Sequence, residues 1–410
     1  MPTSFLLASA SLAIGLALCP AARAETLVVR GELVHTLAGA SIKEGVVVVT
    51  DGRIAAVGAA ATTTVPPGAR ELRARVVTPG LVDARTTVGL SGILNQPHDQ
   101  DVLDKGAPVQ PDLRALDAFN AREELVGYVR SLGITTVNTG PAPGALVPGQ
   151  TGIFKLHGRS ADEDVLQPGA MIAVTLGKEG TTEEKGKTPG SRAKSVAVLR
   201  AELIKAQEYA RKREAKDETK RPARDLRSEA FLRALEGRQP LLVTAQRAPD
   251  ILAALRIADE FKLKVILNGC ADAPIVLEQI KASGFPVILH PTMYRAYDDA
   301  ENLSMETAAK LKAAGVLFAI QSGYEAYVPK TRVVLFEAAE AAAHGLAYDA
   351  ALASITIDAA KILGIADRVG SLEPGKDADL ALYDGDPFEY TTRCLGTLID
   401  GREYPGEHDF

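Results

Sequence analysis

The chain has 410 residues, 46% of them hydrophobic, and a formal net charge of −6. This size suits one large globular domain with a smaller module. The balance of 46 basic against 52 acidic residues excludes a protein that binds nucleic acid through a strongly basic surface.

The chain begins with an apolar run, Leu6–Leu18. The run is too short to anchor a protein across a bilayer, and an Ala-x-Ala sequence of the secretory cleavage type ends just before Glu25. We therefore predict a signal peptide over residues 1–24, no stable membrane anchor, and a periplasmic or secreted protein. Cys19 would suit a lipoprotein, but the bulky leucine before it disfavours that alternative.

Two cysteines remain after this leader, Cys270 and Cys394, far apart in the sequence. Two buried, unpaired thiols are favoured over a disulfide. Cys270 follows the end of an expected strand, but a nucleophilic thiol needs an oriented base, and no local pattern supplies one.

Both ends of the mature chain have the pattern of β-strands. Near the N-terminus two apolar runs flank Asp51-Gly52, and near the C-terminus strand-like runs flank a second Asp-Gly pair. Asp-Gly between apolar runs is a strong hairpin signal, because a type I′ turn needs positive φ at both central residues. Neither end alone has enough strands to bury a core, so we expect residues 25–78 and 370–410 to form one composite β-sandwich.

Between these ends, residues 79–369 alternate short apolar strands with amphipathic helices, as in parallel sheets built from βαβ units. Strands are expected at Gly80–Val88, Ile134–Thr139, Gly152–Leu156, Met171–Thr175, Pro240–Thr244, Lys264–Leu267, Pro286–Leu289 and Val316–Ile320. Helices are expected at Pro249–Phe261, Pro274–Ser283, Met305–Ala314 and Thr331–Gly345. Eight such strands predict an α/β fold with a (β/α)8 TIM-like barrel. No strand is followed by Gly-x-Gly-x-x-Gly, which argues against a dinucleotide fold.

One segment, Lys178–Arg227, is dense in charged residues. We interpret it as a solvated insertion with a charged helix around Ser195–Lys212.

Four segments carry a more specific pattern. They are Asp51–Gly58, the Pro-Gly-Leu-Val-Asp-Ala sequence of Pro79–Ala84, Thr356–Ile365 and Gly370–Leu380. In this order they resemble the amidohydrolase superfamily, in particular its imidazolonepropionase-like periplasmic branch. The resemblance implies hydrolysis of carbon–nitrogen bonds other than peptide bonds, in cyclic amides or dipeptide-like substrates, with zinc or another divalent metal as the family norm.

The family's metal-ligand positions hold other residues here. Its first-strand histidines correspond to Arg85 and Thr87, its fifth-strand histidines to Thr244 and Gln246, its sixth-strand histidine to Asn268, and Ser322 is followed by glycine where the family has aspartate. Zinc sites need imidazole, thiolate or carboxylate ligands, whereas hydroxyl and amide oxygens donate weakly and a guanidinium repels a cation. We therefore predict that the chain holds no metal and needs no other cofactor.

Arg85 is the residue most able to replace the lost cation. Together with Lys155, if both point to the barrel mouth, it would bind a carboxylate or oxyanion. Neutral polar side chains would complete a substrate-binding ring: Thr87, Thr244, Gln246, Asn268 and Ser322. The expected ligand is a small molecule that is anionic or bears an amide. The alternative is that Arg85 pairs with a nearby carboxylate and is structural.

His290 ends the seventh expected strand and would face the same mouth. It is a candidate general base with a pKa near neutrality, although a structural, hydrogen-bonded histidine is favoured. Lys155 also matches the branch's Gln-x-x-x-x-Lys pattern, which completes a candidate catalytic set of His290, Arg85 and Lys155.

The loop after the first expected strand carries several polar residues, His98, Asp99, Asp101 and Asp104. A solvated or helix-capping loop is favoured over a lid or a site for a hard cation, because no known calcium-loop spacing is present.

Two hypotheses about function follow. The first is a divergent amidohydrolase that works without metal through His290 and Arg85. The second, which the site chemistry favours, is a non-catalytic periplasmic binding or scaffold protein, a pseudoenzyme that keeps the barrel and its pocket. Either would bind a small molecule and no nucleic acid, and the oligomeric state, including a homo-oligomer, stays open.

Overall fold

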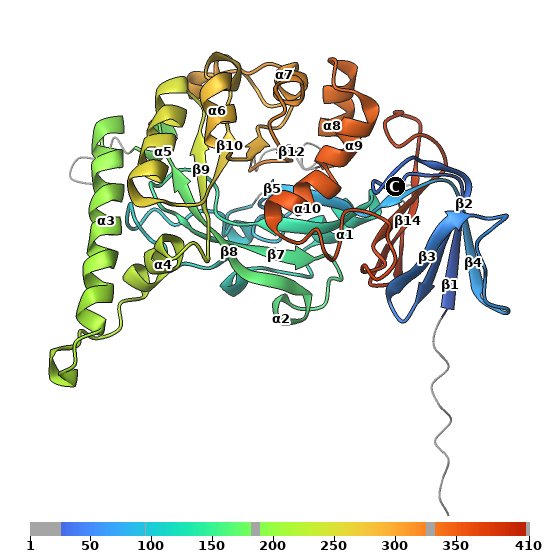
Figure 1. The fold of residues 1–410 in the computed structure, drawn as a ribbon, viewed down its shortest axis with the longest axis horizontal. Helices are drawn as coiled ribbons and strands as arrows, with labels where there is room; N and C mark the ends of the chain where they lie inside the picture. The colour runs from blue at the N-terminus through green and yellow to red at the C-terminus, as the bar shows by residue number, and fades with distance from the viewer. Residues whose placement is uncertain (1–25, 95, 182–188, 325–332, 407–410) are drawn as a thin grey trace, which may run out of the picture.

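The computed structural model describes residues 26–94, 96–181, 189–324 and 333–406 (Figure 1). The predicted signal peptide lies outside these residues. Within them, no helix has the length and hydropathy needed to cross a membrane. The chain forms two sheets, and helices surround the larger one (Figure 1).

The larger sheet is a nearly closed barrel of eight strands. In order they are β5 (Leu81–Thr86), β6 (Ile134–Thr139), β7 (Gly149–Lys155), β8 (Val165–Thr175), β9 (Leu241–Ala245), β10 (Val265–Gly269), β11 (Val287–Leu289) and β12 (Phe318–Ile320). A parallel bridge between Thr86 and Gly323 joins the first strand to the segment just after the last. All eight strands predicted from the apolar runs are present, so the TIM-like architecture is confirmed.

β7 departs from the prediction because it runs antiparallel to both neighbours. The described residues 140–148 between β6 and β7 contain no helix, and the short helix α2 (Ala161–Asp164) leads from β7 to β8. Such short connections suit antiparallel pairs, whereas parallel pairs need a longer crossover. The barrel is therefore not eight uniform βα units. Since Lys155 pairs with Thr136 near the start of β6, β7 ends at the amino ends of the parallel strands.

Helices cover the barrel, and those near residues 249–261, 274–283, 305–314 and 331–345 were predicted. The helices are α1 (Glu124–Ser131), α5 (Ala248–Phe261), α6 (Leu277–Ser283), α7 (Thr307–Ala314), α8 (Val334–Ala343), α9 (Tyr348–Ser354) and α10 (Ile357–Leu363). Short 3-10 turns are η1 (Pro97–Asp99), η2 (Ala115–Asp117), η3 (Lys178–Gly180), η4 (Glu218–Lys220), η5 (Ala273–Ile275) and η6 (Asp298–Ala300). Figure 1 shows α5, α6, α7 and α8 along one side of the barrel.

Alternate residues of the barrel strands belong to two separate cores. Leu242, Ile266, Ile288 and Ala319 share an inner core with residues of α10, while the residues on either side of Leu242 pack toward the outer helices. This alternation is the period of two expected of a strand. Polar residues two positions beyond the inner-core residues therefore point into the barrel as well.

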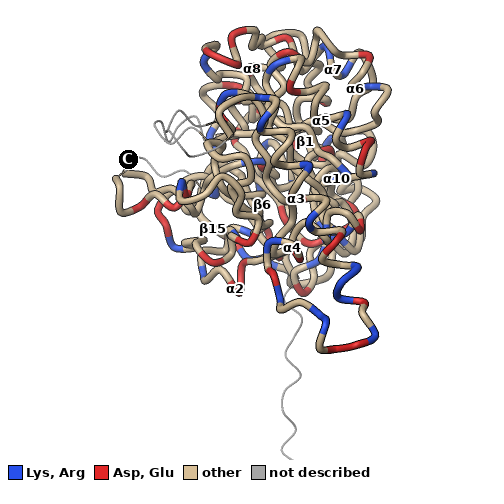
Figure 2. The backbone as a smooth tube through the Cα atoms, turned by 90° about the vertical axis from the view of Figure 1, so that its left-hand side faces the viewer, with Lys and Arg blue, Asp and Glu red and all other residues tan. Residues whose placement is uncertain are grey.

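The charged insertion contains α3 (Arg192–Arg213) and α4 (Leu226–Leu235), so the helix predicted around Ser195–Lys212 is confirmed. Only a narrow stripe of α3 is buried, including Leu199, Leu203 and Ala206. Figure 2 shows basic and acidic residues along the segment that projects beyond α3.

The smaller sheet takes strands from both chain ends. Its order is β15 (Arg402–Pro405), β14 (Cys394–Ile399), β13 (Leu380–Tyr383), β4 (Arg70–Pro79), β1 (Thr26–Val34), β2 (Ile42–Thr50) and β3 (Arg53–Ala59). It is one continuous sheet, where two packed sheets were expected. A bridge between Arg53 and Asp377 brings β3 to the segment before β13, so the sheet curls around its apolar core.

Two Asp-Gly turns meet at one end of this sheet. Both have positive φ at their central residues, 50° and 77° at Asp51-Gly52 and 50° and 74° at Asp400-Gly401. This confirms the predicted type I′ geometry. The turns touch, since a Cβ added to Gly52 would lie 2.7 Å from the backbone oxygen of Asp400.

We expect Gly52→Ala to lower the free energy of unfolding by about 2 kcal/mol, because alanine is strained at this φ and collides with the second turn. Gly39→Ala is the matched control, since a Cβ there meets nothing within 4 Å. Denaturant unfolding would measure both, and equal effects of the two substitutions would contradict the packing of the turns.

Candidate functional site at the barrel mouth

The predicted polar ring lies at the carboxyl ends of the parallel strands. Thr244, Asn268 and His290 each follow an inner-core residue by two positions and are at least nine-tenths buried. Gln321 follows Ala319 in the same way, and the sequence analysis missed it. The period of two starting from Ala319 would have identified it.

These side chains bond to one another. Asn268 Nδ2 donates to Thr244 Oγ1 at 2.8 Å, and Gln321 Nε2 donates to Asn268 Oδ1 at 2.8 Å. Gln321 also donates to the backbone oxygen of Leu289 at 2.9 Å. A hydrogen-bond chain thus ties together the ends of β9, β10, β11 and β12.

A buried carboxyl, Asp83 on β5, supports the neighbouring side of the mouth. Its oxygens accept hydrogen bonds from the Ser322 hydroxyl and, at 3.1 Å, from the Ser322 backbone N–H. The Ser322 hydroxyl lies 3.0 Å from Thr86 Oγ1. Burial raises the pKa of Asp83 to about 6, although the hydrogen bonds from Ser322 oppose the shift. Ser322 therefore joins β5 to the segment after β12.

Arg85 is buried and holds the loop after β6. Its Nη1 donates to the backbone oxygens of Thr86 at 2.6 Å and Gly140 at 3.2 Å, and its Nη2 donates to that of Pro141. Burial lowers the pKa of Arg85 to about 10, so it stays charged at neutral pH. The structural alternative expected a carboxylate partner, but the partners are backbone carbonyls.

Thr87 and Gln246 lie at the rim. Thr87 Oγ1 is 3.2 Å from the Ser91 hydroxyl, in the loop that follows β5. Gln246 Oε1 accepts a hydrogen bond from the backbone of Ala271 at 3.3 Å. Thr87 thus contacts the loop that follows its own strand, whereas Gln246 contacts the loop after the neighbouring strand β10.

His290 is neutral at physiological pH. Nδ1 lies 2.9 Å from the backbone oxygen of Pro291 and must donate to it, since a carbonyl only accepts. Burial lowers the pKa of His290 to about 4, which corrects the expectation of a value near neutrality. Nε2 is buried and has no hydrogen-bond partner among the described residues.

Comparison with known proteins agrees with this fold and topology. A model of the amidohydrolase family matches residues 269–403. Imidazolonepropionase of Rhizorhabdus wittichii is 25% identical over 365 residues, which are 84% of this chain and 88% of that protein. The crystal structure of an amidohydrolase from Thermotoga maritima MSB8 superposes with a TM-score of 0.88 at 29% identity, over 93% of this chain and 100% of that chain. The chain belongs to the amidohydrolase superfamily. It is imidazolonepropionase-like within it.

A second relative matches over part of its own length. The amidohydrolase tasK of Hapsidospora irregularis is 23% identical over 358 residues, which are 80% of this chain and 36% of that protein. The shared region therefore corresponds to about a third of tasK.

The residues at the barrel mouth do not fit a divalent metal. Guanidinium, hydroxyl and carboxamide groups occupy the ligand positions, and zinc prefers imidazole, thiolate or carboxylate. Among the described residues, no group of three or more His, Cys, Asp or Glu is arranged to hold a metal ion. The donors present are also committed to one another, as in the bond from Asn268 to Thr244.

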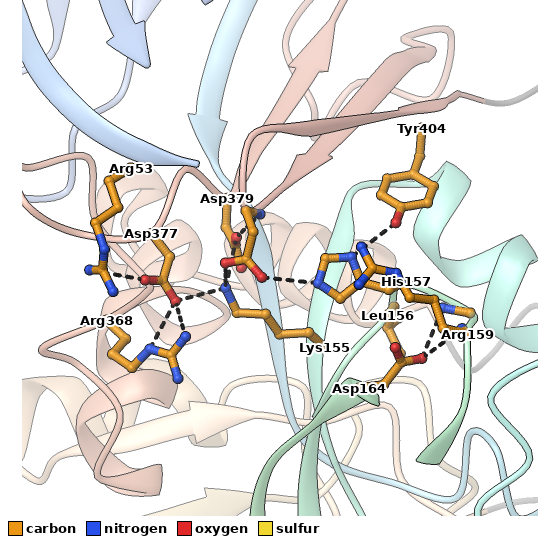
Figure 3. Close-up of polar contacts among 12 residues, drawn as sticks. Arg53, Lys155, Leu156, His157, Arg159, Asp164, Arg368, Asp377, Asp379 and Tyr404 are labelled. Atoms are coloured by element: carbon orange, nitrogen blue, oxygen red, sulfur yellow. Dashed lines mark hydrogen bonds and ion pairs between the residues drawn. The ribbon is translucent and has the colours of Figure 1, made fainter. Parts of the chain in front are cut away.

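Lys155 is not at the mouth, which corrects the expectation that it acts beside Arg85. It lies at the opposite end of the barrel, because β7 is antiparallel. Its Nζ contacts Asp377 at 2.8 Å, Asp379 at 3.1 Å and also Asp400 (Figure 3). Burial alone would lower the pKa of Lys155, but these carboxylates raise it overall. Lys155 therefore joins the barrel to the smaller sheet.

A histidine extends this ionic cluster. His157 Nε2 is 3.0 Å from Asp400 Oδ2, and its Nδ1 is 2.9 Å from the Tyr404 hydroxyl (Figure 3). On the other side, Arg368 pairs with Asp377 at 2.6 Å. The cluster connects β7 with the segments that flank β13 and β14.

The acidic residues of the loop after β5 accept hydrogen bonds from the same loop, and His98, Asp101 and Asp104 are exposed, as in the solvated loop that was one of the two favoured interpretations. Asp104 Oδ1 accepts hydrogen bonds from the backbone of Gly106 at 2.7 Å and from Gln110 Nε2 at 3.1 Å. The hydrogen bond from Gly106 lowers the pKa of Asp104. Asp99 accepts from Gln100 Nε2 at 2.8 Å, and His98 shares its 3-10 turn.

Both described cysteines, Cys270 and Cys394, are free and buried, as predicted. Burial raises the pKa of the Cys270 thiol well above its usual value, so it carries no thiolate at neutral pH.

One buried acid, Glu337, and one half-buried acid, Glu179, were not predicted from the sequence. Glu337 on α8 accepts a hydrogen bond from the backbone of Met293 at 2.8 Å, and burial raises its pKa to about 8. Glu179 lies in the loop after β8, and burial raises its pKa to about 7. Only the fold buries these residues, so no local pattern marks them.

We expect Lys155→Met to lower the free energy of unfolding by about 3–5 kcal/mol, because it leaves three carboxylates without their shared cation. Arg70→Met is the control, since its pair with Glu403 is exposed and such pairs contribute about 0–1 kcal/mol. Denaturant unfolding would measure both variants. A smaller loss of unfolding free energy in Lys155→Met than in Arg70→Met would contradict the role of Lys155 in joining the barrel to the smaller sheet.

Glu337 should make stability fall as pH rises. Its folded pKa lies above the unfolded value, so the folded state binds the extra proton between about pH 5 and pH 8, and that stabilisation is lost as pH rises through about 8. We expect Glu337→Gln to reduce this loss by up to about 4 kcal/mol. Thermal or denaturant unfolding across this range would show it, with Glu32→Gln, at an exposed site, as control. Parallel curves for wild type and Glu337→Gln would refute the assignment.

Proposed function

We propose that this protein is a non-catalytic amidohydrolase-fold protein that binds a small, amide-bearing molecule at the barrel mouth. The observation that carries the proposal is the hydrogen-bond chain through Thr244, Asn268 and Gln321. It occupies two positions where the family resemblance implies metal ligands, and it satisfies them without an ion.

Unpaired polar atoms support binding at this mouth. Arg85 Nε, His290 Nε2 and Gln321 Oε1 are buried and have no hydrogen-bond partner among the described residues. They come from the ends of β5, β11 and β12, which are neighbours around the barrel. Each such group costs about 1–3 kcal/mol when left unpaired. An amide or a carboxylate, which accepts from Arg85 Nε, would satisfy part of this set.

Hydrolysis of a carbon–nitrogen bond would need an activated water. In the family a metal supplies it, and the donor set here suits a metal poorly. His290 Nε2 favours the alternative of a metal-free hydrolase that uses Arg85 to bind the oxyanion. A base whose pKa is about 4 removes a proton from water inefficiently at neutral pH, so binding without turnover is the stronger proposal.

The leader sequence Leu6–Leu18 supports a periplasmic or secreted location for this binding function. A homo-oligomer is compatible with the proposal, and no step of it needs one.

Metal analysis combined with activity assays tests the proposal. Purified protein should hold less than about 0.1 equivalent of zinc, and should not turn over cyclic amides, N-acyl amino acids or dipeptides above the buffer rate. N-acyl amino acids should raise its Tm by binding.

An imidazolonepropionase purified in parallel is the control for metal loss. One equivalent of zinc, or turnover that a chelator abolishes, would overturn the proposal. Metal-free turnover that His290→Gln removes would instead establish the alternative hydrolase.

A further inference from the structure

Three tyrosines gather on the loops that follow the carboxyl ends of two barrel strands. Tyr294 and Tyr297 follow β11, and Tyr324 follows β12. The ring centroids of Tyr294 and Tyr297 are 5.9 Å apart, and those of Tyr294 and Tyr324 are 6.2 Å apart. Tyr297 is 53% exposed, so the group reaches the surface. We call these three residues the tyrosine cluster.

Glu179 joins the cluster from the loop after β8. Both of its carboxylate oxygens lie 3.3 Å from the Tyr324 hydroxyl, which can donate to either. Gln246, at the end of β9, interacts with the same Tyr324 hydroxyl. Through Gln246, the tyrosine cluster and Glu179 are therefore in contact with the candidate site at the barrel mouth.

Glu179 has no positive partner among the residues that the structure describes. Two cations on neighbouring segments pair with other carboxylates: Lys178 contacts Asp298 at 3.0 Å, and Arg192 contacts Asp299 at 2.6 Å. Burial, together with Asp298 and Asp299, raises the pKa of Glu179 to about 7. A carboxylate without a counter-ion is costly to bury, and a cation placed beside it would offset that cost.

Aromatic faces and a carboxylate together attract a positively charged group. The π face of tyrosine is negative, so an ammonium or guanidinium above it is stabilised, and more strongly where water is excluded. We infer that the tyrosine cluster and Glu179 bind the cationic end of the ligand, an alkylated ammonium or a guanidinium group. The inference rests on the proposed ligand site, and it adds a second recognition element to the amide-binding atoms of the mouth.

Choline is the probe, and 3,3-dimethylbutan-1-ol is its neutral isostere of the same shape. In calorimetric titration of the full chain at pH 8, choline should bind at least about tenfold more tightly than the isostere. Equal affinity for the two compounds, or no heat with either, would overturn the inference.

Variants separate charge from packing. Glu179→Gln should weaken choline binding about tenfold or more, and Tyr297→Leu should weaken it several-fold while Tyr297→Phe, which keeps the ring, should not. Tyr297 is exposed, so its replacement leaves the fold intact. Unchanged affinity in both Glu179→Gln and Tyr297→Leu would refute the site.

The pH dependence gives an independent readout. Only ionised Glu179 attracts the cation, so choline affinity should rise about tenfold between pH 6 and pH 8 and stay flat in Glu179→Gln. Choline binding by a protein that also proves to be a zinc hydrolase would sustain this inference and reject the proposed function. Metal-free, inactive protein that does not bind choline would sustain the proposed function and reject this inference.

Discussion

The hydrogen bonds that link Thr244, Asn268 and Gln321 determine what the barrel mouth can do. In a low-dielectric interior, polar groups must be paired, and here they pair with one another across neighbouring strands. An ion would have to break these bonds and then accept weaker ligands. Among the described residues this network leaves a few donors and acceptors unpaired, which the proposed amide or carboxylate ligand would partly satisfy.

Charged groups lie at both ends of the barrel. The family resemblance implies a metal cation at the mouth, whereas here three carboxylates surround the Lys155 ammonium at the other end. That cluster holds the curled sheet against the barrel, with the Asp400 turn as its contact. At the mouth, the charges are a guanidinium held by backbone carbonyls and buried acids such as Asp83, whose pKa values burial raises. The ionic cluster and the proposed ligand site therefore lie at opposite ends of the barrel.

The local sequence pattern was sufficient to predict much of this structure, and the features that it failed to predict have physical causes. Apolar runs located all eight barrel strands, and the Asp51-Gly52 turn had the geometry that its residues require. The direction of β7 depends on the length of its connections to β6 and β8, and the sequence analysis took β7 to be parallel. Lys155 was therefore expected at the barrel mouth, whereas it lies at the opposite end. Its partners are 222 to 245 residues away, beyond any local signal. Gln321, by contrast, could have been found from the period of its own strand.

Anomalous diffraction from crystals soaked in zinc tests the central claim most directly, because it locates an ion and the side chains around it together. The account predicts no anomalous peak in the barrel mouth and an intact hydrogen bond from Asn268 to Thr244. A peak coordinated by mouth side chains, with Asn268 turned away from Thr244, would contradict it.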